Sequence, residues 1–101
     1  MTPTNFDIQF SNKALNEFKV LKNDHSKKNI SKAIIKSLRL MMENLRHPSL
    51  NTHKYDDYLG PNGEEVFESY AQNNTPGAYR IFWFYGPGKK EITILAITPH
   101  P

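Results

Sequence analysis

The chain has 101 residues, of which 38% are hydrophobic and 23% are charged, and this composition indicates a folded globular protein rather than a disordered or fibrous one. It contains no cysteine, which excludes disulfide scaffolds, thiolate zinc sites and cysteine nucleophiles. No apolar run approaches the roughly 18 residues of a membrane span, and the first ten residues lack the pattern of a signal peptide. We therefore expect a single cytoplasmic domain over residues 1–101, with no membrane association.

The net charge of +3 is unevenly distributed along the chain. Residues 1–54 carry ten basic and four acidic side chains, a net charge of +6, whereas residues 55–101 carry three basic and six acidic side chains, a net charge of −3. Residues 12–46 alone hold nine basic and three acidic side chains. A solvated helical surface explains this excess, and a surface for RNA or an acidic protein would require the lysines to cluster beside a site.

The first half of the chain predicts one strand followed by two helices. Residues 6–10 alternate apolar and polar side chains, as a half-buried strand does, and Ser11 is a plausible N-cap for the helix that follows. Residues 22–26 form a polar break before a second helix, which we expect to continue to the pair His47-Pro48. One apolar stripe at helical spacing marks this second helix: Ile30, Ile34, Leu38, Met41 and Leu45.

The second half predicts a long loop and three strands. Residues 48–65 contain proline and glycine and show little periodicity, so we expect a long irregular connection of the kind that is often functional. Strands are expected at residues 66–71, 79–85 and 91–98, with a turn at 86–90. The order β-α-α-β-β-β predicts an α+β fold in which two N-terminal helices pack on one face of a small, mainly antiparallel sheet. The other face would be open to a ligand.

The histidines are the first candidates for chemistry. Without cysteine, a zinc site would need three histidines, or two with a carboxylate, and no pair has ligand spacing, so no metal site is predicted. We expect His25 at the surface and His47 at the end of a helix. His53 in the long loop and His100 after the last strand could meet at one end or face of the sheet.

Arg80 lies in the middle of the most aromatic strand. Regular alternation puts it on the same face as Phe82 and opposite Trp83, which we expect in the core rather than on a docking surface. A partly buried arginine needs a partner, either Glu68 on the neighbouring strand in an ion pair or a phosphate group that fits its planar guanidinium. The residues leave both interpretations open.

Several segments occur in the order typical of one protein family: Leu45-Arg46-His47-Pro48-Ser49-Leu50, Thr52-His53-Lys54, Val66-Phe67-Glu68, Ala78-Tyr79-Arg80-Ile81-Phe82-Trp83 and Ile94-Leu95-Ala96-Ile97-Thr98-Pro99-His100. In these segments and in its element order, the chain resembles the RelE/ParE superfamily of toxins from type II toxin–antitoxin pairs. Members similar to RelE, YafQ and HigB are ribonucleases that usually cut messenger RNA in the ribosomal A site.

The resemblance implies a metal-independent endoribonuclease, an mRNA interferase that needs no cofactor. Arg80 matches the third-strand arginine of the family, His100 the residue after the last strand, and His53 the loop histidine of YafQ-like toxins. In the implied reaction a base removes the 2′-hydroxyl proton, the oxygen attacks the adjacent phosphate, and an acid protonates the leaving 5′-oxygen. Arg80 would stabilise the developing charge, His100 would be the acid and His53 the base or an orienting group, although these two assignments could be exchanged.

The second predicted strand, residues 66–71, departs from the family pattern. RelE-like and YafQ-like ribonucleases carry lysine or histidine where this chain has residues 67–70. Glu68 is therefore either the general base or the partner that neutralises Arg80 and weakens the activity. The resemblance also leads us to expect substrate contacts from four further side chains: Lys54, Arg46, His47 and Tyr70.

Two other functions remain open at this point. ParE-like toxins, which inhibit gyrase without catalysis, also have a Tyr-Arg strand, a glutamate on the preceding strand and a histidine after the last strand. The third possibility is an inactive homologue that only binds an antitoxin. All three imply a small antitoxin as partner in a hetero-oligomer, and the ribonuclease implies messenger RNA and the ribosome as well.

Overall fold

The computed structural model describes residues 5–72 and 77–99. Its elements, in chain order and with η for short 3₁₀ helices, are β1 (Asp7–Phe10), α1 (Asn12–Asn23), η1 (His25–Lys27), α2 (Lys28–Glu43), η2 (Pro48–Leu50), β2 (His53–Leu59), β3 (Glu65–Tyr70), β4 (Tyr79–Tyr85) and β5 (Glu91–Pro99). The strands form one sheet in the order β1-β5-β4-β3-β2. β1 runs parallel to β5 and the other neighbours are antiparallel, so the α+β class and the mainly antiparallel sheet are confirmed.

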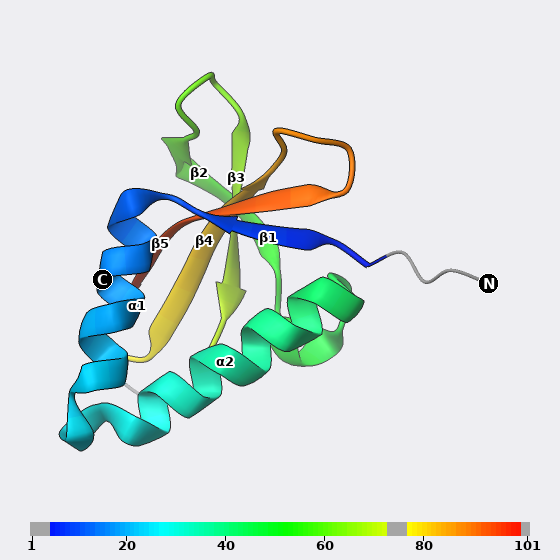
Figure 1. Ribbon diagram of the computed structural model, residues 1–101. Coiled ribbons are helices and arrows are strands. Elements are labelled where there is room, and N and C mark those ends of the chain that lie inside the picture. The colour runs from blue at the N-terminus through cyan, green and yellow to red at the C-terminus, as the bar shows by residue number, and fades with distance from the viewer. Residues whose placement is uncertain (1–4, 73–76, 100–101) are drawn as a thin grey trace.

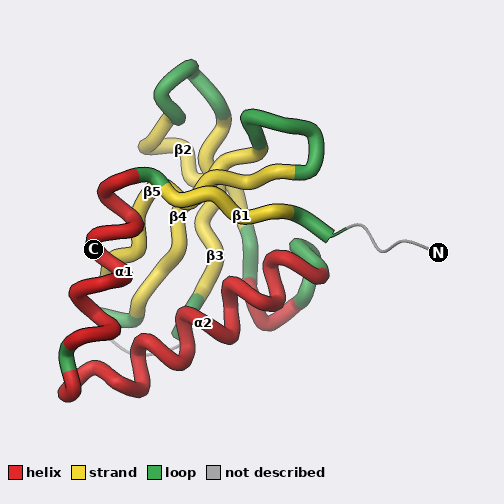
Figure 2. Tube along the Cα trace, viewed as in Figure 1, coloured by secondary structure: helices red, strands yellow, loops and turns green. Residues whose placement is uncertain are grey.

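The two long helices lie on one side of the sheet. Figure 1 shows α1 and α2 as a helical hairpin, and Figure 2 separates these helices from the strands by colour. The main core lies between the two layers and includes Ile34 and Met41 of α2 together with Ile81, Trp83 and Ile94 of the sheet. The face of the sheet that the helices leave uncovered, called the open face below, carries a smaller cluster formed by Val66, Phe82 and Ala96.

Ser11 begins α1, as the sequence predicted. Its hydroxyl oxygen accepts a hydrogen bond of 3.0 Å from the backbone N–H of Ala14, which would otherwise have no partner in the first turn. The same hydroxyl donates to the carbonyl oxygen of Leu95 at 3.0 Å. One side chain therefore caps the helix and ties it to β5.

The expected irregular connection over residues 48–65 is wrong, because this segment contains η2 and the strand β2. β2 lies at the edge of the sheet, antiparallel to β3, and its side chains are exposed at nearly every position. Its sequence is therefore polar on both faces and lacks the apolar alternation of a half-buried strand. The element order is β-α-α-β-β-β-β rather than the predicted β-α-α-β-β-β.

The second helix also ends earlier than expected. α2 stops at Glu43, and Asn44 takes an extended conformation with φ −159° and ψ 95°, its N–H still bonded to the carbonyl of Leu40. Leu45 lies beyond the helix and yet packs against the main core. The apolar stripe therefore continues past the end of the helix. For this reason the sequence predicted a helix that extends too far, to His47-Pro48.

The burial of Trp83 confirms the prediction that this residue of the aromatic strand lies in the core. Its side chain is fully buried, and its indole N–H donates to the hydroxyl of Ser69 at 2.8 Å. Trp83 faces the helices and Phe82 the open face, as alternation along β4 requires, and an extra residue in β5 between the partners of Phe82 and Trp83 lets both Ile94 and Ile97 reach the main core. Within the described residues no helix is long and apolar enough to cross a membrane.

Candidate functional site

A buried carboxylate lies on the open face between two side chains that can carry positive charge. β3 positions the group, because Glu68 is paired in register with His53 of β2 and Tyr70 is paired with Arg80 of β4. His53 Nε2 lies 2.8 Å from Glu68 Oε1, and Arg80 Nε lies 3.5 Å from Glu68 Oε2. Glu68 is 2% exposed and Arg80 is 7% exposed. The ion pair between Arg80 and Glu68, one of the two roles that the sequence left open for Arg80, is therefore present.

The two ring nitrogens of His53 face two different oxygen atoms. Nε2 meets the Glu68 carboxylate, and Nδ1 lies 3.0 Å from the carbonyl oxygen of Asn51. A carbonyl oxygen accepts hydrogen bonds and cannot donate them, and an ionised carboxylate likewise only accepts. Both ring nitrogens of His53 therefore lie within hydrogen-bond distance of an oxygen acceptor.

Tyr70 covers Arg80. The centre of its ring lies 3.7 Å from the guanidinium carbon, and the ring meets His53 edge-on with 5.9 Å between the ring centres. Arg80 Nη1 also donates to the backbone carbonyl of Gln72 at 3.0 Å. A phosphate group would therefore reach Arg80 only after Tyr70 moves aside.

Lys54 points away from this group. It is paired in register with Phe67, whose ring faces the helices, and its ammonium lies 3.1 Å from Glu65 and 3.6 Å from Asp56. The hydrogen bond to Glu65, followed by the charges of Glu65 and Asp56, raises the pKa of the Lys54 ammonium above its ordinary value of 10.5. The predicted contact of Lys54 with substrate thus lies on the opposite face from Glu68, beside two carboxylates.

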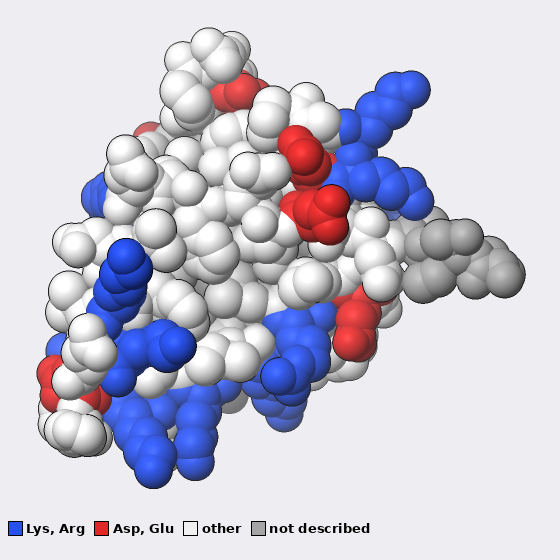
Figure 3. All heavy atoms as spheres, viewed as in Figure 1, with Lys and Arg blue, Asp and Glu red and all other residues white. Residues whose placement is uncertain are grey.

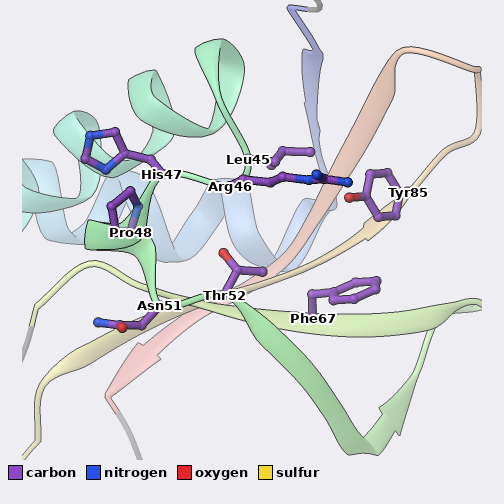
Figure 4. Close-up of a pocket in the computed structure, with 8 residues that line it drawn as sticks. All are labelled: Leu45, Arg46, His47, Pro48, Asn51, Thr52, Phe67 and Tyr85. Carbon is purple, nitrogen blue, oxygen red and sulfur yellow. The ribbon is translucent and has the colours of Figure 1, made fainter.

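Arg46 and His47 line a different pocket of about 440 Å³, which Figure 4 shows with Arg46 extended towards Tyr85. Phe67 forms part of this pocket, which therefore lies on the helix side of the sheet. His47 does not end α2 but caps η2, because its Nδ1 accepts a hydrogen bond of 3.2 Å from the N–H of Ser49. The structure does not bring Arg46 and His47 together with Glu68, and His100 lies outside the described residues.

The sequence missed an aromatic groove on the open face. Tyr55 and Tyr58 of β2 stand against Phe82 of β4, with ring centres 4.9 Å and 6.0 Å from that of Phe82, around a hollow of about 280 Å³. Two tyrosines, Tyr55 and Tyr58, within a short polar segment were the signal that could have indicated it. That signal was lost once the segment was interpreted as a loop.

The basic helical surface lies away from the buried carboxylate. Figure 3 shows many Lys and Arg side chains gathered along the side of the molecule formed by α1 and α2. Those of α2 are exposed on the helix side of the sheet, whereas Glu68 faces the other way. This placement favours the interpretation as a solvated helical surface. Within residues 5–72 and 77–99 no three His, Asp or Glu side chains group in a way that could hold a metal ion.

No protein-family model and no curated protein sequence matches this chain. Solved structures match it over nearly its whole length. A YoeB/ParE toxin from Agrobacterium tumefaciens is 5% identical, with a TM-score of 0.68 over 95% of this chain and 100% of that one. The chain has the RelE/ParE toxin fold.

Two toxin–antitoxin complexes show the same RelE/ParE likeness. The archaeal RelE–RelB complex from Pyrococcus horikoshii contains a chain that is 11% identical, with a TM-score of 0.65 over 94% of each chain. The heterotetrameric YoeB–YefM complex from Staphylococcus aureus contains one that is 18% identical, with a TM-score of 0.65 over 95% of this chain and 98% of that one. These matches confirm the RelE/ParE fold that the sequence resemblance implied. In this fold, the helices leave uncovered the sheet face that carries Glu68.

Proposed function

We propose that the chain is the toxin of a type II toxin–antitoxin pair and acts as a metal-independent endoribonuclease on messenger RNA, on translating ribosomes. The observation that carries this proposal is the buried Glu68 carboxylate held between His53 and Arg80 on the open face of a RelE/ParE fold. The fold limits the class of protein, and the three side chains supply groups that can move a proton and stabilise negative charge.

His53 is the proton donor in the proposed reaction. Its ring lies between the Glu68 carboxylate and the Asn51 carbonyl, and in the protonated form it would transfer the Nδ1 proton from the Asn51 carbonyl to the leaving 5′-oxygen when substrate binds. Glu68 holds the ring in position and stabilises its charge. The base that removes the 2′-hydroxyl proton is then His100, so the acid and base roles are the reverse of the first assignment from the resemblance.

Arg80 contributes its charge to the same step. Negative charge grows on the phosphate oxygens as the 2′-oxygen attacks, and a guanidinium in a site with little water stabilises that charge more than it stabilises the ground state. Because Tyr70 covers Arg80, we propose that substrate binding displaces the Tyr70 ring and exposes the guanidinium.

A matched pair of histidine variants tests the proposal. His53→Asn removes the proton donor, whereas His25→Asn changes an exposed histidine in the turn between the helices. We expect His53→Asn to lower the rate of messenger RNA cleavage on translating ribosomes by at least about 100-fold, the lower end of what general acid–base catalysis supplies, and His25→Asn to leave it unchanged. Primer extension on the recovered messenger RNA measures both rates. Equal cleavage by the two variants, or intact messenger RNA with the wild type, would contradict the proposal.

The burial of Arg80 favours a second candidate, a ParE-like toxin that inhibits gyrase by binding. An arginine that is 7% exposed and paired with Glu68 can serve as a structural ion pair in a protein without catalysis. In this case the wild type inhibits growth, messenger RNA stays intact, and gyrase accumulates cleaved DNA in its presence. An inactive antitoxin-binding homologue would show neither effect.

The partner proposed for either activity is a small antitoxin that forms a hetero-oligomer with this chain. The RelE–RelB and YoeB–YefM complexes, which share the fold, support this partner. Co-expression with the product of the neighbouring open reading frame tests it. We expect the two proteins to purify together and the activity to be neutralised, and separate elution with undiminished activity would contradict the proposal.

A further inference from the structure

The aromatic groove on the open face has the size and lining of a small ring-binding site. Phe82 is buried at its floor, Tyr55 is half-buried, and Tyr58 is 40% exposed. Its volume of about 280 Å³ is at the lower limit of ligand pockets, which begin at roughly 300 Å³. The groove therefore accommodates one planar ring system and not a base pair.

This groove directly adjoins the candidate catalytic group. Tyr55 is two residues after His53 on the same strand, and Phe82 is the register partner of Glu68. Thr98, which also lines the groove, is the register partner of Arg80. Neighbouring strands are about 4.8 Å apart and alternate residues of one strand are about 6.7 Å apart, so the groove lies within one nucleotide of the group.

Asp57 lets the groove discriminate between nucleobases. It lines the hollow from β2, on the strand that also carries Tyr55 and Tyr58, and its carboxylate is a pure acceptor that can take two parallel hydrogen bonds. Guanine is the base with two adjacent donors on its Watson–Crick edge, N1–H and N2–H₂. Adenine and cytosine have an acceptor next to their amino group, and uracil has acceptors on both sides of its N–H. In each of these bases a lone pair would face the carboxylate oxygen and repel it.

We propose that the groove is a nucleobase subsite of the open face, in which the aromatic rings stack on the base and Asp57 selects guanine. The proposal rests on the ribonuclease function proposed above and adds the base that lies next to the cleaved bond. A phosphate is disfavoured in the groove because Asp57 would repel it. At the rim stands Lys13, whose ammonium pairs with Glu17 at 2.6 Å and offers a positive charge to the nucleotide backbone.

Two neighbouring aspartates provide the test. Asp57→Asn removes the selective carboxylate, and Asp56→Asn makes the same change of charge at the next residue, which does not line the groove and lies 3.6 Å from Lys54. Guanosine 5′-monophosphate and adenosine 5′-monophosphate are titrated separately into the full chain, and binding is followed by amide chemical shifts in β2 and β4. We expect the guanine nucleotide to bind at least about fivefold more tightly, because a good bidentate contact discriminates by roughly 5- to 150-fold. Asp57→Asn should reduce this ratio to within about twofold, and Asp56→Asn should retain it.

Tyr58 separates stacking from selectivity. Tyr58→Leu should weaken both nucleotides about fivefold or more, without changing their ratio, and Tyr58→Phe should bind both as the wild type does. Equal binding of the two nucleotides by the wild type would overturn the proposal. So would tighter binding of N-acetyl-arginine amide than of the guanine nucleotide, since the groove would then be a cage for a basic side chain of a protein partner.

The two proposals can fail independently. Messenger RNA cleavage that depends on His53, together with no Asp57-dependent guanine preference, would leave the ribonuclease function intact and overturn the subsite. Binding of the guanine nucleotide that depends on Asp57, without any cleavage of RNA, would support the subsite and overturn the ribonuclease function.

Discussion

Glu68 lies among side chains that exclude nearly all water, in contact with both His53 and Arg80. Removing a carboxylate and a guanidinium from water costs several kcal/mol for each ion, and their mutual attraction offsets this cost only while both are present. The loss of one charge leaves the other buried without compensation. The same side chain is therefore needed for the folded state and for the orientation of the proposed proton donor.

Glu68→Gln should lower the free energy of unfolding by about 3–5 kcal/mol, the range measured when one partner of a buried ion pair is removed. Glu65→Gln on the same strand is the matched control, because Glu65 pairs with Lys54 at the surface and exposed pairs contribute less than about 1 kcal/mol. Urea unfolding at neutral pH measures both changes. The double variant Glu68→Gln/Arg80→Met should recover part of the loss, and strictly additive losses would contradict the ion-pair account.

At the scale of single elements, the start of α1 depends on Ser11. Ser11→Ala removes the cap on the N–H of Ala14 and the bond to the carbonyl of Leu95. We expect a loss of about 1–2 kcal/mol, since N-cap serines contribute about that much. Ser49→Ala, at an exposed position of η2, should change the free energy of unfolding by less than about 0.5 kcal/mol. Thermal or urea unfolding of the two variants checks the difference, and equal losses would show that the cap is unimportant.

The turn between the helices should respond to acid. The Asp24 carboxylate accepts hydrogen bonds from the hydroxyl and the N–H of Ser26, at 2.6 Å and 3.0 Å, and these bonds lower its pKa below the ordinary value of 3.8. A carboxyl group with a lowered pKa in the folded state stabilises that state above the unfolded pKa and loses its contribution as the pH falls through the folded pKa. Asp24→Ala should therefore melt below the wild type at about pH 6, and the two melting temperatures should converge towards about pH 3. A difference that stays constant with pH would contradict this role.

The sequence predicted the buried elements better than the exposed ones. β4 and β5 pack in the interior, so their apolar residues marked them, and the stripe of α2 was found for the same reason. β2 was missed because an exposed edge strand has no buried face to leave a pattern. The ion pair of Arg80 with Glu68 could be anticipated from alternation on adjacent strands. The contact of His53 with Glu68 could not, because it depends on the register between β3 and a strand that was not predicted.

At the scale of the whole molecule, the charges of the helical layer and the open face are separated by the sheet. The smallest dimension of the molecule is 24 Å, and the Debye length is about 8 Å at physiological ionic strength and about 30 Å at 0.01 M salt. Cations on the outer surface of α2 are thus screened from a ligand on the open face at physiological salt. They can act on it only when little salt is present.

Two charge reversals, each of which changes the net charge from +3 to +1, test this separation. Lys13→Glu reverses a charge at the rim of the open-face groove, and Lys32→Glu reverses an exposed charge on α2. At about 0.15 M salt, Lys13→Glu should slow RNA cleavage about fivefold, the effect of roughly 1 kcal/mol for one close charge, and Lys32→Glu by less than about twofold. At about 0.01 M salt the effect of Lys32→Glu should grow, because the Debye length then exceeds the thickness of the molecule. If the two variants slowed cleavage equally at physiological salt, the basic helical layer would itself bind the RNA. That result would contradict the open face as the substrate-binding surface.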